Sequence, residues 1–418
     1  MIEYRKHLLD NGLTLITHEA DDTPLATVNM LYNVGSRDED PQHTGFAHLF
    51  EHLMFSGTQR FPDFDSVVNT LGGENNAFTN NDYTNYYITL PADSLSTALA
   101  LEADRLNNFV LTQEALEVQQ DVVTDEYKQR FLNQPYGDMW LLLRSLCYTR
   151  YPYRWSPIGA DIRHVGEATL QEVQAFHGRY YRPDNAILAV AAPLSHEEML
   201  HRVEDVFEAS LDTHATASRK FATEREYEAE PQQLQPRRLE VERDVPSDAI
   251  YLAWLMGDRW DPLFCASDLV SDVLSNGKSS RLYSKYIRSG QLVTEVDAYL
   301  SADAGPGLFI MSAKPRAGVD VETVVETLRK EARLLVDERV TEKEMKKALN
   351  KNAFDFSCTQ YHASDRALSL CYYTWLGDTD LINRRSENYD TVTPEVLQRA
   401  ASEIFRQESE NLLIIRKK

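Results

Sequence analysis

Short stretches of alternating apolar and polar residues near the N-terminus predict a series of β-strands. Residues 6–17 predict a hairpin, because the Asp-Asn-Gly sequence at 10–12 is a strong turn signal between two strand-like runs. Residues 26–34 form a third predicted strand, which Gly35 ends. Residues 185–192 are apolar almost throughout, and this predicts a buried strand.

Other segments repeat their apolar residues every three or four positions, which is the period of a helix. Residues 46–54 predict a buried amphipathic helix that Gly57 ends. Residues 74–91 are rich in Asn, Thr and Tyr and predict a two-stranded hairpin. Further helices are predicted at residues 66–71, 93–131 and 167–180.

The second half of the chain repeats features of the first. Residues 28–37 match residues 250–259 in apolar character and in the positions of Gly and Arg, with an offset of 222 (250 minus 28). A repeated segment at a fixed offset suggests the internal duplication of one α+β unit. The predicted fold class is therefore α+β, with two homologous domains of similar topology, each an antiparallel sheet flanked by helices.

Chain length supports this division, because 418 residues exceed what one ordinary core holds. Residues 213–238 are polar, contain two prolines and have no apolar period, so we expect the domain linker there. The predicted domains are residues 1–212 and residues 239–418.

Composition limits the classes of function. The chain is 43% hydrophobic and 26% charged, which is typical of a globular protein. We expect a cytoplasmic protein, because the sequence has no apolar run long enough to span a membrane and no signal peptide. The four cysteines contain no C-x-x-C pair and indicate reduced thiols. A net charge of −22 argues against nucleic acid as a partner and is compatible with cationic peptides.

The predicted helix at residues 46–54 carries the candidate chemistry. His48 and His52 are four residues apart, so both imidazoles lie on one face and could hold one Zn²⁺. Glu51 lies near that face, and the H-x-x-E-H order is that of the inverted zincins. The alternative is a pair of core histidines with no metal. At the offset of 222, the second copy has three apolar residues in place of His48, Glu51 and His52, namely Val270, Val273 and Leu274.

A catalytic zinc site needs a third protein ligand. The predicted helix at residues 113–131 offers several acidic side chains, and spacing alone does not choose among them. The candidates are Glu114, Glu117, Asp121, Asp125 and Glu126.

These motifs together resemble one known family. The H-x-x-E-H motif is followed by Gly72-Gly73, by Asn76-Ala77-Phe78-Thr79, by Asp82-x-Thr84-x-Tyr86, and by a Glu seventy-four residues after His52. This arrangement resembles the pitrilysin/insulysin family of zinc metallopeptidases, which includes the mitochondrial processing peptidase and half-length bacterial enzymes. The resemblance covers the whole chain, with its most specific motifs in residues 35–137.

The resemblance implies roles for individual residues. It implies that Glu126 is the third zinc ligand, completing a metal set with His48 and His52 and one Zn²⁺ per chain. It implies that Glu51 is the general base. Asn76 and Ala77 match the edge strand on which the family binds a peptide substrate by main-chain hydrogen bonds.

Two departures from the family pattern affect the interpretation. Gln119 stands seven residues before Glu126, where the family often has a second Glu, so a hydrogen-bonding role is kept without the charge. Active members also supply an Arg and, seven residues later, a Tyr that hold the substrate. The matching positions here are Gly290 and Asp297. Arg366 and Tyr373 have the same spacing in a different context, which we interpret as coincidence.

The main hypothesis is a zinc endopeptidase acting on extended oligopeptides. The resemblance implies a closed chamber between two clamshell halves, of which a half-length chain supplies one. We therefore expect a homologous partner subunit that carries the Arg/Tyr pair, in a heterodimer, with a homodimer as the alternative. The competing hypothesis is a non-catalytic structural or processing-complex subunit that retains the metal site.

Overall fold

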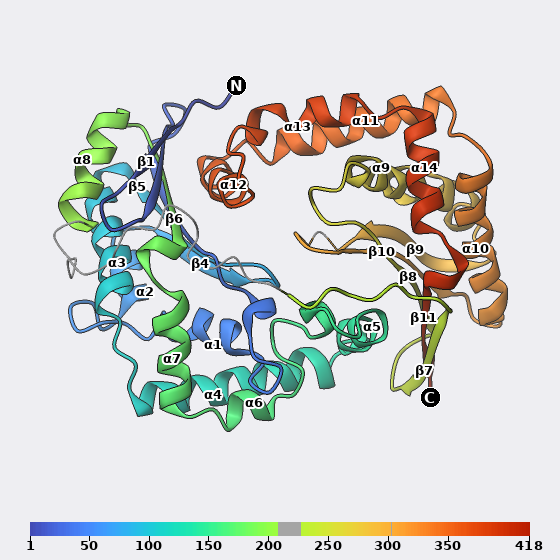
Figure 1. Cartoon of the computed structure of the whole chain (residues 1–418), viewed down its shortest axis with the longest axis horizontal. Helices are drawn as coiled ribbons and strands as arrows, with labels where there is room; N and C mark the ends of the chain where they lie inside the picture. The colour runs from blue at the N-terminus through green and yellow to red at the C-terminus, as the bar shows by residue number, and fades with distance from the viewer. Residues whose placement is uncertain (208–226, 302) are drawn as a thin grey trace. The chain divides into compact units, whose positions relative to one another are not determined.

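The computed structural model describes residues 1–207, 227–301 and 303–418 (Figure 1). Backbone contacts divide the chain into two compact units, each assembled from three segments. The first unit comprises Met1–Tyr127, Trp155–Tyr227 and Ser357–Arg384. The second comprises Lys128–Arg154, Glu228–Phe356 and Arg385–Lys418.

The first unit is built on a six-stranded sheet with the order β1-β2-β6-β3-β5-β4. Its strands are β1 Arg5–Leu8, β2 Thr14–Glu19, β3 Leu25–Tyr32, β4 Glu74–Thr79, β5 Thr84–Pro91 and β6 Ala186–Ala192. Neighbouring strands are antiparallel except β2 and β6, which pair in parallel. The strands and hairpins expected from the alternation of apolar and polar residues are confirmed. Strand β4 forms one edge of the sheet.

Helices cover both faces of this sheet. Helix α12 packs on β3 and β6, whereas α3 and α8 lie on the opposite face (Figure 1). The predicted helix at residues 93–131 is two helices, with a break after Asn108 and a π-helical segment at Lys128–Leu132. The helices of this unit are α1 Phe46–Leu53, α2 Phe64–Thr70, α3 Leu95–Asn108, α4 Gln113–Tyr127, α6 Arg163–Gly166, α7 Leu170–Tyr180, α8 His196–Phe207 and α12 Ala363–Trp375.

The second unit contains a five-stranded sheet with the order β7-β11-β8-β10-β9. Its strands are β7 Arg237–Arg243, β8 Ala249–Leu255, β9 Val293–Leu300, β10 Leu308–Pro315 and β11 Glu410–Lys417. Strands β7 and β11 pair in parallel and the other neighbours are antiparallel. This is the pairing pattern of the first sheet without β1, which supports the duplication inferred from the offset of 222.

The helices of the second unit pack on its sheet, and an apolar core lies between them. Ile250, Leu252 and Trp254 alternate along β8 and are buried with residues of α9, α10 and α14. Helices α11 and α13 each have residues in both units, because the division of the chain falls within them. The helices are α5 Met139–Cys147, α9 Phe264–Ser275, α10 Val321–Asp337, α11 Glu342–Cys358, α13 Leu381–Asp390 and α14 Pro394–Ile404.

The units differ from the contiguous domains expected from the sequence. Residues 128–154 belong to the second unit and residues 357–384 to the first. Helix α5 follows α4 in the chain but packs on β8 and β11, and α12 follows α11 but packs on β3 and β6. An apolar helix face does not specify which sheet it covers, so this reciprocal exchange is not visible in the sequence. The predicted linker at 213–238 includes residues 213–226, which lie outside the described residues.

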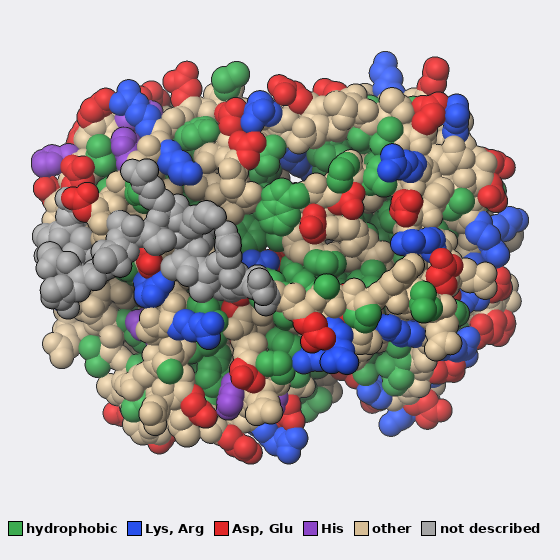
Figure 2. All heavy atoms as spheres, viewed as in Figure 1, with side chains coloured by type: hydrophobic (Ala, Val, Ile, Leu, Met, Phe, Trp, Pro, Cys, Tyr) green, Lys and Arg blue, Asp and Glu red, His purple; other side chains and the backbone are tan. Residues whose placement is uncertain are grey.

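Charged side chains are dispersed over the face of the molecule drawn in Figure 2. On the face drawn in Figure 2, acidic side chains are interspersed with Lys and Arg. The net charge of −22 is therefore not gathered into one acidic patch on that face. Among the residues that the structure describes, no helix has the length and apolarity needed to cross a membrane.

Candidate metal centre

Helix α1 presents the two histidines toward α4. Phe46, Leu49 and Leu53 are buried, as expected for an amphipathic helix with its apolar side in the core. The helix ends at Leu53, so the predicted end at Gly57 was wrong. Gly57 instead adopts a φ of 85° in the following turn, where a Cβ would lie 2.5 Å from a backbone oxygen.

Three potential ligand atoms come together between α1 and α4. The Nε2 atoms of His48 and His52 lie 3.6 Å and 3.2 Å from Oε2 of Glu126. Within residues 1–207, 227–301 and 303–418, this is the one group of three or more His, Cys, Asp or Glu whose ligand atoms all lie within 4.8 Å of one another. A tetrahedral ion with bonds of about 2.0–2.1 Å needs ligand atoms about 3.3–3.4 Å apart, so the geometry fits zinc.

Among the acidic residues of α4, Glu126 is the one directed at the histidines. Its side chain is 16% exposed, and those of His48 and His52 are 9% and 25% exposed. The other four candidates, Glu114, Glu117, Asp121 and Asp125, are all exposed on the helix surface. The structure thus brings together the three residues that the family resemblance implied as ligands.

Glu51 is half-buried on α1, directly before His52. Two tyrosines from other elements of the first unit lie near its carboxylate. Burial, and to a lesser extent the charge of Glu51, raises the pKa of the Tyr86 and Tyr181 hydroxyls. Glu51 does not belong to the group of His48, His52 and Glu126 whose ligand atoms lie together.

Buried polar contacts fix the C-terminal half of α1. The Tyr86 hydroxyl on β5 donates to the carbonyl oxygen of Phe50 at 3.0 Å. The guanidinium of Arg105 on α3 lies over the ring of Tyr86, 4.5 Å from its centroid, and forms a buried ion pair with Glu102. Tyr86 thus links α1 to β5, the strand beside β4.

The N-terminal end of α1 is also held by a buried carboxylate. Glu39 accepts the backbone N–H of Gly45 at 2.8 Å through Oε2 and that of Ala47 at 2.9 Å through Oε1. Burial raises the pKa of Glu39 well above its ordinary value, although the two N–H donors oppose this. Sequence reasoning missed this residue, because its partners lie six and eight positions away. The available signal was Gly45 itself, which has no side chain with which to cap the helix.

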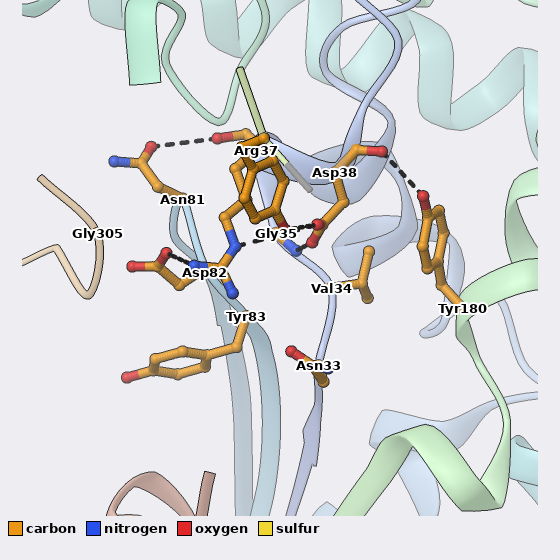
Figure 3. Close-up of polar contacts among 12 residues, drawn as sticks. Asn33, Val34, Gly35, Arg37, Asp38, Asn81, Asp82, Tyr83, Tyr180 and Gly305 are labelled. Carbon is orange, nitrogen blue, oxygen red and sulfur yellow. Dashed lines mark hydrogen bonds and ion pairs between the residues drawn. The ribbon is translucent and has the colours of Figure 1, made fainter. Parts of the chain in front are cut away.

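A second cluster joins the loop before α1 to the turn between β4 and β5 (Figure 3). Arg37 donates through Nη1 to Oδ1 of Asp82 at 2.6 Å, and the Ser36 hydroxyl donates to Oδ1 of Asn81 at 3.1 Å. Gly35 packs so closely on this turn that a Cβ would lie 2.5 Å from backbone atoms of Asn81. These contacts therefore fix the β4–β5 hairpin relative to α1.

Asn76 and Ala77 lie on β4, at the edge of the first sheet. Ala77 pairs with Tyr86 of β5, and its backbone N–H is accepted by Oδ1 of Asn76 at 2.8 Å. Gln119 is half-buried on α4, two helical turns before Glu126 and on the same side of the helix. Their predicted roles in substrate binding and in tuning the metal site stay predictions.

At the equivalent helix of the second unit, apolar residues stand in place of the candidate ligands. Val270, Val273 and Leu274 lie on α9 and are buried in the core. Gly290 has a φ of 66°, a conformation that favours glycine, and Asp297 is exposed on β9.

The spacing of Arg366 and Tyr373 has a structural explanation. Arg366 forms a two-point ion pair with Asp22, with Nη2 at 2.6 Å from Oδ1 and Nη1 at 3.0 Å from Oδ2. Tyr373 is 8% exposed on α12. Both residues are committed to the packing of the first unit, which agrees with their interpretation as coincidence.

Comparison with known proteins gives a consistent family assignment. The family model described as "Insulinase (Peptidase family M16)" matches residues 14–135, and "Peptidase M16 inactive domain" matches residues 167–352. The zinc protease PqqE of Helicobacter pylori is 27% identical over 412 residues, covering 95% of this chain and 89% of that protein.

Solved structures agree with the sequence relatives. A protease from Helicobacter pylori superposes with a TM-score of 0.90 at 25% identity, over the full length of both chains. Pitrilysin superposes with a TM-score of 0.78 at 15% identity, over 100% of this chain and 45% of its own, and this likeness concerns the fold alone. The matched domains, the zinc protease relatives and the fold show that this chain belongs to the insulinase, or M16, family of peptidases.

Proposed function

We propose that this chain is a zinc-dependent endopeptidase that hydrolyses extended oligopeptides. The observation that carries the proposal is the meeting of His48, His52 and Glu126 within 4.8 Å, with the carboxylate of Glu51 on the same helix. Metal binding alone would need only the three ligands. A further carboxylate one residue from a ligand histidine supports hydrolysis, because this reaction needs a proton acceptor beside the metal.

One Zn²⁺ held by these residues would act as a Lewis acid and lower the pKa of a bound water to about 7. Glu51 takes the proton from the attacking water and later delivers it to the leaving amine. His48 and His52 would hold the ion through Nε2, the atoms that lie near Oε2 of Glu126. Gln119, two turns before Glu126, offers a hydrogen bond but no charge, and in this proposal it tunes the affinity of the site.

The peptide is proposed to bind as an added strand at the edge of the first sheet. β4 lies at the edge of the sheet, and an edge strand can pair with an extended segment. A peptide strand would compete with the Asn76 side chain for the backbone N–H of Ala77. Binding through main-chain groups would make affinity depend mainly on an extended conformation rather than on one peptide sequence.

We propose one zinc per chain and a homologous partner. The helix of the second unit has apolar residues at the ligand positions, which supports a single site. Gly290 and Asp297 replace the Arg/Tyr pair implied by the family resemblance, and the chain matches less than half of pitrilysin. A partner subunit that supplies the pair would complete the site, so we propose the catalytic subunit of a heterodimer. A cytoplasmic location stays a prediction.

A non-catalytic subunit that retains the metal site is the alternative. The test is hydrolysis of an internally quenched, unstructured peptide by the purified chain, zinc-free and zinc-loaded, with and without a homologous subunit carrying R-x-x-x-x-x-x-Y. The proposal expects cleavage that appears with zinc and disappears with a chelator. Zinc binding without cleavage under any of these conditions would favour the non-catalytic role.

A further inference from the structure

Helix α1 begins at a residue that cannot cap it. Gly45 is the N-cap, with a φ of 94° that favours glycine, and it offers no side chain to the free backbone N–H groups of the first turn. Glu39 takes this place from the preceding loop, with its two carboxylate oxygens on the N–H groups of Gly45 and Ala47. Ala47 is the residue directly before His48, so these bonds set the position of the turn that carries the first histidine.

Four other helices are capped in a simpler way. In α2, α7, α10 and α14, the side chain of the residue directly before the helix accepts a backbone N–H of the first turn. These capping residues are Asp63, Thr169, Asp320 and Thr393. These caps lie at the surface, where a polar side chain costs little. Glu39 is 5% exposed, and burying a carboxyl group costs free energy unless its hydrogen bonds offset the loss of water. Capping α1 with a buried carboxyl group therefore costs more free energy than a surface cap would.

The second copy of the fold indicates that the buried cap is not required by the fold. Asp261 corresponds to Glu39 at the offset of 222 (261 minus 39). It is half-buried, and its Oδ1 accepts the backbone N–H of Leu263, only two residues away, at 2.7 Å. The helix that it precedes has no metal ligands. The long-range buried cap thus occurs in the copy that has the metal cluster.

We infer that Glu39 is a positioning residue for the metal centre, which acts through the first turn of α1 on His48. This inference rests on the proposed zinc site. By holding the N–H groups of Gly45 and Ala47, Glu39 fixes how far Nε2 of His48 lies from Glu126, now 3.6 Å, while His52 sits one turn farther along. Loss of the cap lets the first turn fray, so that His48 spends part of its time away from the ligand position. Metal affinity then falls although all three ligands remain.

The test is zinc affinity, measured by competition with a chromophoric chelator, for the wild-type chain and for Glu39→Gln. The amide retains the size of the side chain but replaces one acceptor oxygen with a donor, so it can satisfy only one of the two N–H groups. Supporting groups of metal ligands typically change metal affinity by about 10–100-fold, and we expect a loss of about 10-fold. The cobalt-substituted variant should also show a changed visible absorption spectrum, because the geometry at His48 changes.

Asp63→Asn is the matched control, because Asp63 caps α2 in the same unit by accepting the Ser66 N–H. It should leave zinc affinity and the cobalt spectrum unchanged. If Glu39→Gln does not fold, Trp155→Phe loosens the same loop more gently, since the indole N–H of Trp155 donates to the Ser36 carbonyl at 2.8 Å. A smaller loss of zinc affinity is then expected.

The outcomes separate this inference from the proposed function. If the wild-type chain binds no zinc, the proposed function fails and the inference fails with it. If the wild-type chain binds zinc and Glu39→Gln lowers the unfolding midpoint of the zinc-free protein while zinc affinity and the cobalt spectrum stay unchanged, Glu39 is only a structural cap. If Glu39→Gln does not fold, unchanged zinc affinity in Trp155→Phe overturns the inference instead.

Discussion

At the scale of single residues, the account depends on which side chains of α1 and α4 face each other. The histidines and Glu126 meet, and the other acidic side chains considered on α4 point to solvent. Removing one of the three ligands leaves two, which is fewer than a catalytic zinc site uses. Exposed carboxylates contribute little to a site that they do not touch.

The first prediction follows from this division. Glu126→Gln and His52→Ala should each weaken zinc binding strongly, whereas Asp125→Asn and Glu117→Gln should leave it unchanged. Zinc titration of the four variants, each first stripped of metal, checks the prediction. Loss of zinc in Asp125→Asn would mean that α4 is rotated from the orientation described.

The sequence carried much of the information at this scale, and its limits have a physical cause. His48, Glu51 and His52 could be placed on one helix face because they are local in the sequence. Glu126 needed the family resemblance, because five acidic residues on one helix are equivalent until the partner helix is known. Glu39 was missed because its bonds to Gly45 and Ala47 depend on how the loop folds back, and no short-range pattern encodes that.

At the scale of elements, the two copies of the fold use the same helix in different ways. In the first copy, α1 meets α4 through the proposed metal ligands His48, His52 and Glu126. In the second, α9 meets α11 through polar contacts, such as the bond of 3.3 Å from Asn352 to Oδ2 of Asp268. Asp272, one turn beyond Asp268, is 8% exposed, and burial raises its pKa to about 6. The charges of Asp268 and Asp355 add to this shift.

The second prediction concerns the pH dependence of Asp272. Because the pKa in the folded chain lies above the ordinary value of 3.8, the folded state binds the proton more tightly than the unfolded state. Proton binding by Asp272 therefore stabilises the folded state fully below about pH 4, and this stabilisation is lost as the pH rises to about 6 and beyond. Asp272→Asn should stabilise the protein by about 1–3 kcal/mol at pH 8, since one pKa unit corresponds to about 1.4 kcal/mol.

Urea unfolding at pH 5 and pH 8 measures this effect, with the exposed Asp121→Asn as a control that should change little. A lower unfolding midpoint for Asp272→Asn at pH 8 would contradict the assignment of a raised pKa.

Elements were predicted better than their assembly. Apolar patterning, turn signals and composition predicted the strands of the first sheet, and the match of residues 28–37 with residues 250–259 predicted the equivalence of β3 and β8. Strands β7, β9, β10 and β11 were not predicted. The exchange of α5 and α12 between the units was not predicted, because an amphipathic helix shows that it has a buried face but not which sheet buries it.

At the scale of the whole molecule, the chain has a metal cluster in one unit and an apolar equivalent in the other. Each unit has its own sheet and buried core, so we expect neither to depend on one ion for folding. Our third prediction is that removing zinc with a chelator leaves the far-ultraviolet circular dichroism at room temperature unchanged. Cooperative unfolding on chelation would make the site structural rather than catalytic.

The fourth prediction is that a homologous subunit raises activity. The positions corresponding to the Arg/Tyr pair are Gly290 and Asp297, so the isolated chain should bind zinc but position a peptide poorly. Misplaced substrate can cost about 10²-fold in rate. Specific activity should therefore rise by about that factor when a partner carrying the pair is added at matched zinc occupancy. Full activity alone, unchanged by the partner, would show that other residues replace the pair.

The role of Glu51 is tested most directly by the rate of peptide hydrolysis by Glu51→Gln at matched zinc occupancy, relative to the wild-type chain. The substitution removes the proton acceptor and leaves His48, His52 and Glu126 in place. The account predicts unchanged zinc content and a rate lowered by at least about 10²-fold, the usual contribution of a general base. Near-normal hydrolysis by the zinc-loaded variant would contradict the role of Glu51 and, with it, the proposed mechanism.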